Sequence, residues 1–215
     1  MSDPGGGYLK LVTENKTVVL PSPLAPEDGF LTFLHYFSGL AEFGLGEAIL
    51  KAAALRDIKV RVIKRDIRLD GIDLLADELF TTDLLAASDG RFDGFHSGFP
   101  CSTFGCARFL PGGPPPVRER QHMRGRPSNS RSQQLEAEKE TLLAVRSAVI
   151  VRAIQFGAKK RKLLGTATLE NPADPGVDPF PSAWLLPALA DLVTDSNFEC
   201  ATHNICCFGP PHSLE

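Results

Sequence analysis

The sequence lacks the features that mark several large classes of protein. None of its apolar runs approaches the roughly 18–20 residues of a membrane-spanning helix. Its first ten residues, MSDPGGGYLK, lack the charged and apolar regions of a secretory signal. The net charge of −3 gives no general excess of positive charge for binding nucleic acid, and the five cysteines, an odd number, favour reduced thiols over a disulfide framework. We therefore expect an intracellular protein, nuclear or cytoplasmic, that does not insert into a membrane.

Two common ligand-binding motifs are also missing. The glycine-rich stretch at 38–46 does not have the G-x-G-x-x-G spacing that binds dinucleotides. Near the C-terminus, Cys200, His203 and Cys206 have a spacing that superficially suits zinc, but a second Cys or His pair is absent. We therefore predict no metal site, and we interpret residues 198–208 as a strand with small buried thiols.

Strand and helix patterns alternate along most of the chain. The 215 residues, 43% hydrophobic and 23% charged, suit one globular domain at 28–209, with a loose leader at 1–27 and a tail at 210–215. Strands are predicted at 30–37, 58–63 and 92–99, within 162–172 and at 198–208, and helices at 46–55, 71–80, 134–157 and 182–193. In the last helix, Pro187 indicates either a kink or a late start. This alternation predicts an α/β fold, Rossmann-like, with a mostly parallel sheet and helices on both faces.

The turn after the first predicted strand has the composition of a ligand site. Ser38 and Gly39 lie in it, where glycine lets the backbone approach a ligand and the next helix offers free N–H groups. Asp66, roughly 20 residues beyond the turn, ends the second strand, where a carboxylate can accept hydrogen bonds from ribose hydroxyls. Asp83 is a candidate for contact with an adenine edge in the same crevice. The alternative is an ordinary tight turn with acidic residues at the surface.

Two later strand ends carry residues suited to covalent chemistry. Cys101 follows Pro100 at one strand end, and Glu170 with Asn171 follows another. Because the carboxyl ends of parallel strands meet at one edge, a thiolate and a carboxyl would flank a common crevice. A cysteine can add to an electron-poor carbon of a pyrimidine ring, while a protonated glutamate bonds the ring nitrogen. Alternatively, Cys101 is a metal ligand or a small buried residue, and Glu170 is a solvated acid. His96 either tunes the thiol or is a core histidine.

The order of these motifs resembles that of the DNA cytosine-5 methyltransferase family. The resemblance covers about residues 30–208 and rests on Phe37, Gly39, Asp66, Asp83, Pro100, Cys101, Phe104, Glu170 and Asn171. It implies the class I S-adenosylmethionine-dependent methyltransferase fold, and methyl transfer to carbon 5 of a cytosine flipped out of DNA. It further implies that Cys101 attacks carbon 6 and that Glu170, followed by Asn171, meets the ring N3 edge. The residues that it implies for S-adenosylmethionine are Phe37, Ser38, Gly39, Leu40, Asp66, Asp83 and Pro100.

Several positions depart from the family pattern. His35 takes the place of the usual Asp, Ala41 and Glu42 replace paired glycines, and Ser102 replaces the Gln that follows Pro-Cys. The chain also shows no arginine-bearing Q-x-R strand and no target-recognition domain, which makes a second chain the candidate source of target recognition. The alternative function is therefore a degenerate, non-catalytic domain that binds nucleic acid or a partner protein.

A basic segment follows the Pro-Cys turn. Residues 111–132 are rich in Pro, Gly, Ser and Arg, which predicts a mobile surface loop. Its candidates for contact with the phosphates of DNA, or less favourably of RNA, are Arg118, Arg120, Arg124 and Arg126. Such contacts would weaken as salt rises. In the family that the chain resembles, a mobile loop at this place closes over the flipped base, whereas the alternative is a solvated loop without a partner.

Overall fold

The computed structural model describes residues 10–13, 16–19, 29–39, 44–69, 71–163 and 165–201. Within the predicted leader, β1 (Lys10–Thr13) and β2 (Lys16–Val19) pair as a small antiparallel sheet. The sequence patterns do not predict these two strands.

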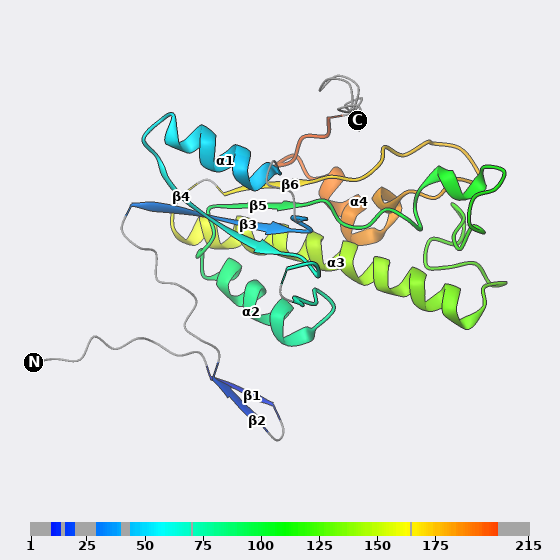
Figure 1. The fold of residues 1–215 in the computed structure, drawn as a ribbon, viewed down its shortest axis with the longest axis horizontal. Helices are drawn as coiled ribbons and strands as arrows, with labels where there is room; N and C mark the ends of the chain where they lie inside the picture. The colour runs from blue at the N-terminus through cyan, green and yellow to red at the C-terminus, as the bar shows by residue number, and fades with distance from the viewer. Residues whose placement is uncertain are drawn as a thin grey trace, which may run out of the picture.

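The domain is built on one four-stranded sheet, drawn at the centre of Figure 1. Its strands are β3 (Phe30–Tyr36), β4 (Lys59–Arg65), β5 (Gly94–Ser97) and β6 (Thr166–Leu169). They lie in the order β4-β3-β5-β6, and every pair is parallel. This arrangement confirms the predicted α/β class with a parallel sheet, and it is consistent with a Rossmann-like fold.

The two faces of the sheet have different surroundings. Along β3, Leu34 and Tyr36 belong to the main hydrophobic core, whereas His35 lies on the opposite face, beside Gly46 of the first helix. The alternation follows from the two-residue period of a strand. One strand therefore supplies residues both to the core and to the second face.

Helices cover both faces of the sheet, as predicted (Figure 1). The helices are α1 (Leu45–Ala54), α2 (Asp77–Ser88), α3 (Arg131–Lys160) and α4 (Pro187–Val193), with short 3-10 turns η1 (Cys106–Phe109) and η2 (Ala183–Leu185). The helices α2, α3 and α4 pack with the sheet into the main core, whose fully buried members include Phe95, Ile154 and Leu189. The helix α1 packs against β4 on the other face.

Several predicted element boundaries are wrong. The helix expected at 71–80 begins at Asp77, where two acidic residues suit a helix N-terminus, and it runs on to Ser88. The strand expected at 92–99 is confined to Gly94–Ser97. The last helix starts late, with Pro187 in its first turn. At this position the N–H that proline lacks has no partner within the helix. The strand expected at 198–208 is not formed over 198–201, and the rest of that range lies outside the described residues.

The sequence predicts that the long helix ends at Gly157. In the structure, α3 continues through this residue. It begins with a capping box in which Ser130 and Gln133 exchange hydrogen bonds, and it ends at Lys160. A Cβ on Gly157 would lie 2.1 Å from the carbonyl oxygen of Ala87 in α2. The glycine is therefore needed for the close approach of two helices, not for a helix end.

Among the described helices, α3 is also long and apolar enough to cross a membrane, judged by length and composition only. Just over half of its apolar window is buried within the domain. A core helix of a water-soluble domain meets the same criterion, so the absence of membrane insertion stays a prediction.

Candidate functional site

The carboxyl ends of β5 and β6 bring two of the predicted catalytic segments together. Ser97 pairs with Leu169 in the strand register, and the Glu170 N–H donates to the Ser97 carbonyl at 2.9 Å. The side-chain amide of Asn171 donates to the Phe99 carbonyl at 3.1 Å. As predicted from the sequence, Cys101 and Glu170 therefore leave the sheet at one edge.

The turn that carries Cys101 is held by a buried carboxylate of α3. The Glu140 side chain accepts hydrogen bonds from the Ser102 hydroxyl and from both the N–H and the hydroxyl of Thr103. Phe104 is buried, and its N–H donates to the Cys101 carbonyl at 3.0 Å. The turn is thus fixed on its inner side while Cys101 is exposed, and the half-buried Pro100 joins it to β5.

The surroundings of the Cys101 thiol keep it protonated in the free protein. Partial burial and the negative charge of Glu140 raise its pKa, and Glu170 adds to the effect. A negative group near a thiol disfavours the thiolate, which is the nucleophilic form. Any covalent chemistry at Cys101 therefore requires that the thiol lose its proton once a substrate is present.

Glu170 has a histidine neighbour that sequence reasoning did not connect with it. The Glu170 side chain is 76% exposed, and its Oε2 lies 3.8 Å from Nε2 of His96. The other ring nitrogen of His96, Nδ1, lies 2.8 Å from the Thr168 hydroxyl. His96 and Thr168 are register partners in the sheet, so strand alternation at the predicted strand ends was the signal that could have found this contact.

The turn between β3 and α1 has an unusual backbone. Phe37 and Gly39 have φ values of 57° and 64°, and the left-handed conformation is unfavourable for a phenylalanine. The Gly39 N–H donates to Oδ2 of Asp66 at 2.8 Å, and Oδ1 of Asp66 accepts the Arg68 N–H at 2.9 Å. The hydroxyl oxygen of Ser38 is buried and has no hydrogen-bond partner within the described residues. Strain and an unpaired polar atom at a turn are features of a ligand site.

Other predicted cofactor residues are placed differently. Leu40 lies outside the described residues. Asp83 is buried in α2, where its oxygens accept hydrogen bonds from the Tyr36 hydroxyl at 3.0 Å and from the Arg65 guanidinium at 3.0 and 3.1 Å. The predicted contact with an adenine edge is therefore wrong for Asp83, because this carboxylate is used inside the core. Burial, together with the negative charge of Asp83, raises the pKa of Tyr36 well above the usual range.

The basic segment is packed onto the domain instead of forming a solvated loop. Arg118 is 0% exposed and lies over the Phe104 ring, with its guanidinium carbon 4.0 Å from the ring centroid. Its guanidinium donates to the Thr103 and Thr141 hydroxyls and to the carbonyls of Met123 and Ala137. The predicted contact of Arg118 with phosphate is wrong, because this side chain is a buried structural element.

The other three arginines remain nearer the surface. Arg120 makes a two-pronged ion pair with Asp174 at 2.6 and 3.0 Å, and Arg126 pairs with Glu119 at 3.0 Å. Arg124 is exposed and lines a shallow hollow over α3. Arg124 is thus the most accessible of the predicted phosphate contacts.

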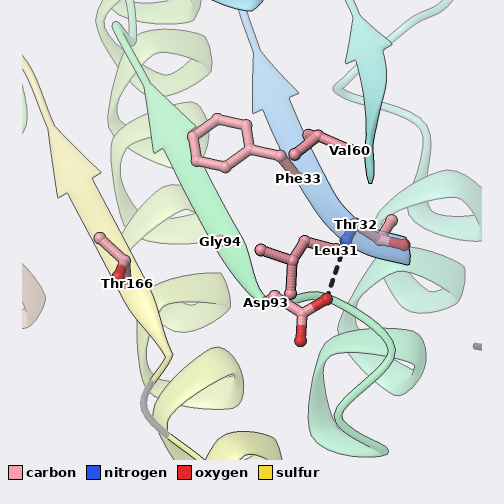
Figure 2. A pocket seen from close by; sticks show the side chains of 7 residues that line it. All are labelled: Leu31, Thr32, Phe33, Val60, Asp93, Gly94 and Thr166. Carbon is pink, nitrogen blue, oxygen red and sulfur yellow. Dashed lines mark hydrogen bonds between the residues drawn. The ribbon is translucent and has the colours of Figure 1, made fainter. Parts of the chain in front are cut away.

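A cavity of about 270 Å³ lies elsewhere on the sheet, at the residues drawn in Figure 2. It is lined by Leu31, Thr32, Phe33, Val60, Asp93, Gly94 and Thr166. The Asp93 carboxylate accepts the Thr32 N–H at 2.8 Å within it. Its lining comes from the starts and middles of the strands, whereas Cys101 and Glu170 follow strand ends, so this cavity is not the candidate site.

Comparisons with known proteins do not identify a relative: no family model, no curated protein and no solved structure matches the chain. The structure alone defines the class: an α/β domain with a parallel sheet, with the His96–Glu170 pair and the exposed Cys101 at the carboxyl ends of β5 and β6.

Proposed function

We propose that the chain is a DNA cytosine-5 methyltransferase domain, with the class I methyltransferase fold. One observation carries the proposal. The exposed Cys101 and the Glu170 carboxyl follow adjacent parallel strands at one sheet edge, and the Asn171–Phe99 hydrogen bond joins the two strand ends. The resemblance in motif order supports the same function.

Each residue has a distinct role in the proposed reaction. The Cys101 thiol loses its proton to solvent and its sulfur forms a bond to carbon 6 of a flipped cytosine, while the ring N3 takes a proton from the Glu170 carboxyl, which makes carbon 5 nucleophilic. Glu170 bonds the N3 edge and stabilises the charge that develops on the ring. After methyl transfer, a water molecule takes the proton from carbon 5, the 5,6 double bond re-forms as the bond from the Cys101 sulfur to carbon 6 breaks, and N3 returns its proton to Glu170. Asn171 acts by positioning, since its amide is already bonded to Phe99.

The turn between β3 and α1 supports binding of S-adenosylmethionine, which supplies the methyl group when bound. The Ser38 hydroxyl, which has no hydrogen-bond partner in the part of the chain that the structure describes, and the left-handed Phe37 and Gly39 are suited to a ligand that approaches the backbone closely. The two oxygens of Asp66 accept one N–H each, which leaves each oxygen a further lone pair for a ribose hydroxyl.

DNA is the proposed partner, with RNA as a less favoured alternative. The proposed phosphate contact is Arg124. Arg120 and Arg126 join it if they exchange their carboxylate partners for phosphates. A second chain is proposed to supply target recognition.

A trapping experiment tests this proposal. A duplex that contains 5-fluorocytosine, incubated with the chain and S-adenosylmethionine, should form a covalent adduct, because fluorine at carbon 5 cannot leave as a proton does. The Cys101→Ser variant should form none, whereas Cys106→Ser should form the wild-type amount, since Cys106 is also exposed but lies in η1. An adduct that survives in Cys101→Ser contradicts the proposed nucleophile.

A non-catalytic domain that binds nucleic acid or a partner protein is the second candidate. The raised pKa of Cys101 favours it, because a protonated thiol is a poor nucleophile. Calorimetry with S-adenosylmethionine distinguishes the two functions. Saturable binding supports the enzyme, and the absence of binding at high concentration leaves only the non-catalytic domain.

A further inference from the structure

Three side chains make a polar row across the carboxyl ends of β5 and β6. They are His96, Thr168 and Glu170, and all three lie on the face of the sheet that carries His35, away from the main core. The alternation along the strands places them so, since Phe95 and Leu169, their chain neighbours, pack in the core. The row ends at the residue to which the proposed reaction assigns the ring N3 edge.

The Glu170 carboxylate determines which nitrogen of His96 carries the proton, and the Thr168 hydroxyl accommodates the result. Partial burial lowers the pKa of His96, although Glu170 opposes the effect, so the ring is neutral at pH 7. A neutral ring has one N–H, and Nε2 faces the Glu170 carboxylate at 3.8 Å. The proton is therefore favoured on Nε2, and Nδ1 then accepts from the Thr168 hydroxyl at 2.8 Å.

The charges around His96 leave Glu170 as its main electrostatic partner. From β3, the His35 ring meets it edge-on with centroids 5.1 Å apart, and burial lowers the pKa of His35 to about 4, so that ring is uncharged. Lys64 of β4 acts on His35 and is paired with Glu47 of α1 at 2.9 Å.

We propose that His96 is a positioning residue for Glu170: its Nε2–H, held in place by Thr168, directs the exposed carboxyl toward the edge where Cys101 lies. The inference rests on the proposed function, because it assigns His96 a part in the same reaction. A movement of under 1 Å by the exposed Glu170 side chain brings the 3.8 Å contact within hydrogen-bonding range. The carboxyl then has one preferred orientation before a base arrives.

Titration of the histidine rings by NMR in the full chain tests the contact without reference to activity. The His96 signals, assigned with His96→Gln, should titrate at lower pH in Glu170→Gln than in wild type, because the carboxylate that raises the His96 pKa is gone. Equal His96 titration in wild type and Glu170→Gln overturns the inference.

The rate of adduct formation with the 5-fluorocytosine duplex tests the role in the reaction. His96→Ala should slow it on the order of 10-fold to 100-fold, and His96→Gln, which keeps an N–H donor at similar reach, should recover part of the loss. Thr168→Val, which removes the hydroxyl, should slow it more than Thr168→Ser, which retains one. The pH profile should shift in His96→Ala, an effect that a merely structural role would not produce.

The two proposals fail in different ways. If the wild-type chain neither binds S-adenosylmethionine nor forms the adduct, but His96 titration responds to Glu170→Gln, the contact stands and the methyltransferase function falls. If the wild-type chain forms the adduct and His96→Ala neither slows it nor moves its pH profile, the function stands and the positioning role is refuted.

Discussion

The side-chain amide of Asn171 donates a hydrogen bond to the backbone carbonyl of Phe99, at 3.1 Å. This bond crosses from the segment after β6 to the segment after β5, beyond the last register pair, Ser97 and Leu169. It extends the sheet pairing by a side chain at the place where the backbones separate, and it keeps the segments that carry Glu170 and Cys101 together.

Replacing Asn171 by Asp should destabilise the domain by about 1–3 kcal/mol, because the carboxylate cannot donate and would face a carbonyl oxygen. Urea unfolding measures the loss. The adjacent Glu170→Gln is the control, since that side chain is 76% exposed and its change should stay within about 0.5 kcal/mol. Equal stability of the two variants would show that the Asn171 bond contributes nothing.

Gly157→Ala should be strongly destabilising, although alanine normally improves a helix by about 1 kcal/mol over glycine. The added Cβ would lie 2.1 Å from the Ala87 carbonyl oxygen and 2.6 Å from the Gly90 nitrogen, which are backbone atoms that cannot turn aside. We expect a loss of roughly 3 kcal/mol or more. Gly46→Ala in α1 is the comparison, because its Cβ would meet side-chain atoms and no backbone, at 3.2 Å or more, from Lys64, Val62 and His35. Thermal unfolding should show a much larger drop for Gly157→Ala, and a gain in stability would contradict the close approach of α2 and α3.

Arg118→Met should cost roughly 3 kcal/mol, because it removes a buried guanidinium that donates to the Met123 carbonyl and to the Thr103 hydroxyl. The exposed Arg124→Met should change stability by less than about 0.5 kcal/mol. DNA binding, measured by fluorescence anisotropy at several salt concentrations, should reverse this order. Arg124→Met should weaken binding and reduce its salt dependence, so wild-type binding by Arg124→Met would remove this residue from the proposed interface.

Stability should fall as pH falls from about 6.5 toward 4 because of His35. The side chain is 4% exposed, and burial lowers its pKa from 6.5 to about 4. Between these pH values the unfolded chain binds a proton at His35 that the folded domain does not bind. The contribution of His35 to the free energy of unfolding is therefore fully present above pH 6.5 and is lost as the pH falls toward 4. The loss is on the order of 2–3 kcal/mol.

The His35→Leu variant isolates this contribution. Chemical unfolding at several pH values should give a flatter curve between pH 6.5 and 4 for the variant than for wild type. Parallel curves would mean that His35 takes up its proton equally in both states.

Local patterns predicted much of the sheet. The apolar run at 30–37 and the alternating β-branched run at 58–63 lie within one or two residues of β3 and β4. Strand–helix alternation then predicted parallel pairing. The same reasoning placed Cys101 and Glu170 at one edge, because parallel strands end on the same side.

Contacts between distant segments account for what the sequence did not predict. Glycine is a residue that commonly ends helices, so the sequence predicts an end at Gly157. Only the close approach of this residue to Ala87 explains why it lies inside α3. Arg118 lies in a polar, Gly- and Pro-rich stretch of sequence. In the fold its side chain is buried and donates hydrogen bonds to Thr103, Thr141 and two carbonyls. Asp83 forms an ion pair with Arg65, which lies 18 positions away in sequence. Composition describes what a residue can do, whereas burial depends on which segments the fold brings against it.

Thr103 is bonded on both sides of its hydroxyl: it donates to Glu140 and accepts from Nε of Arg118 at 2.8 Å. The residue two places after Cys101 is therefore an anchor shared by the cysteine turn, the basic segment and α3. A ligand that displaces the basic segment must strain or break this anchor, and a change at the cysteine turn is transmitted back by the same atoms. A displacement of the basic segment at Arg118 and a displacement of the cysteine turn therefore act on the same hydroxyl group.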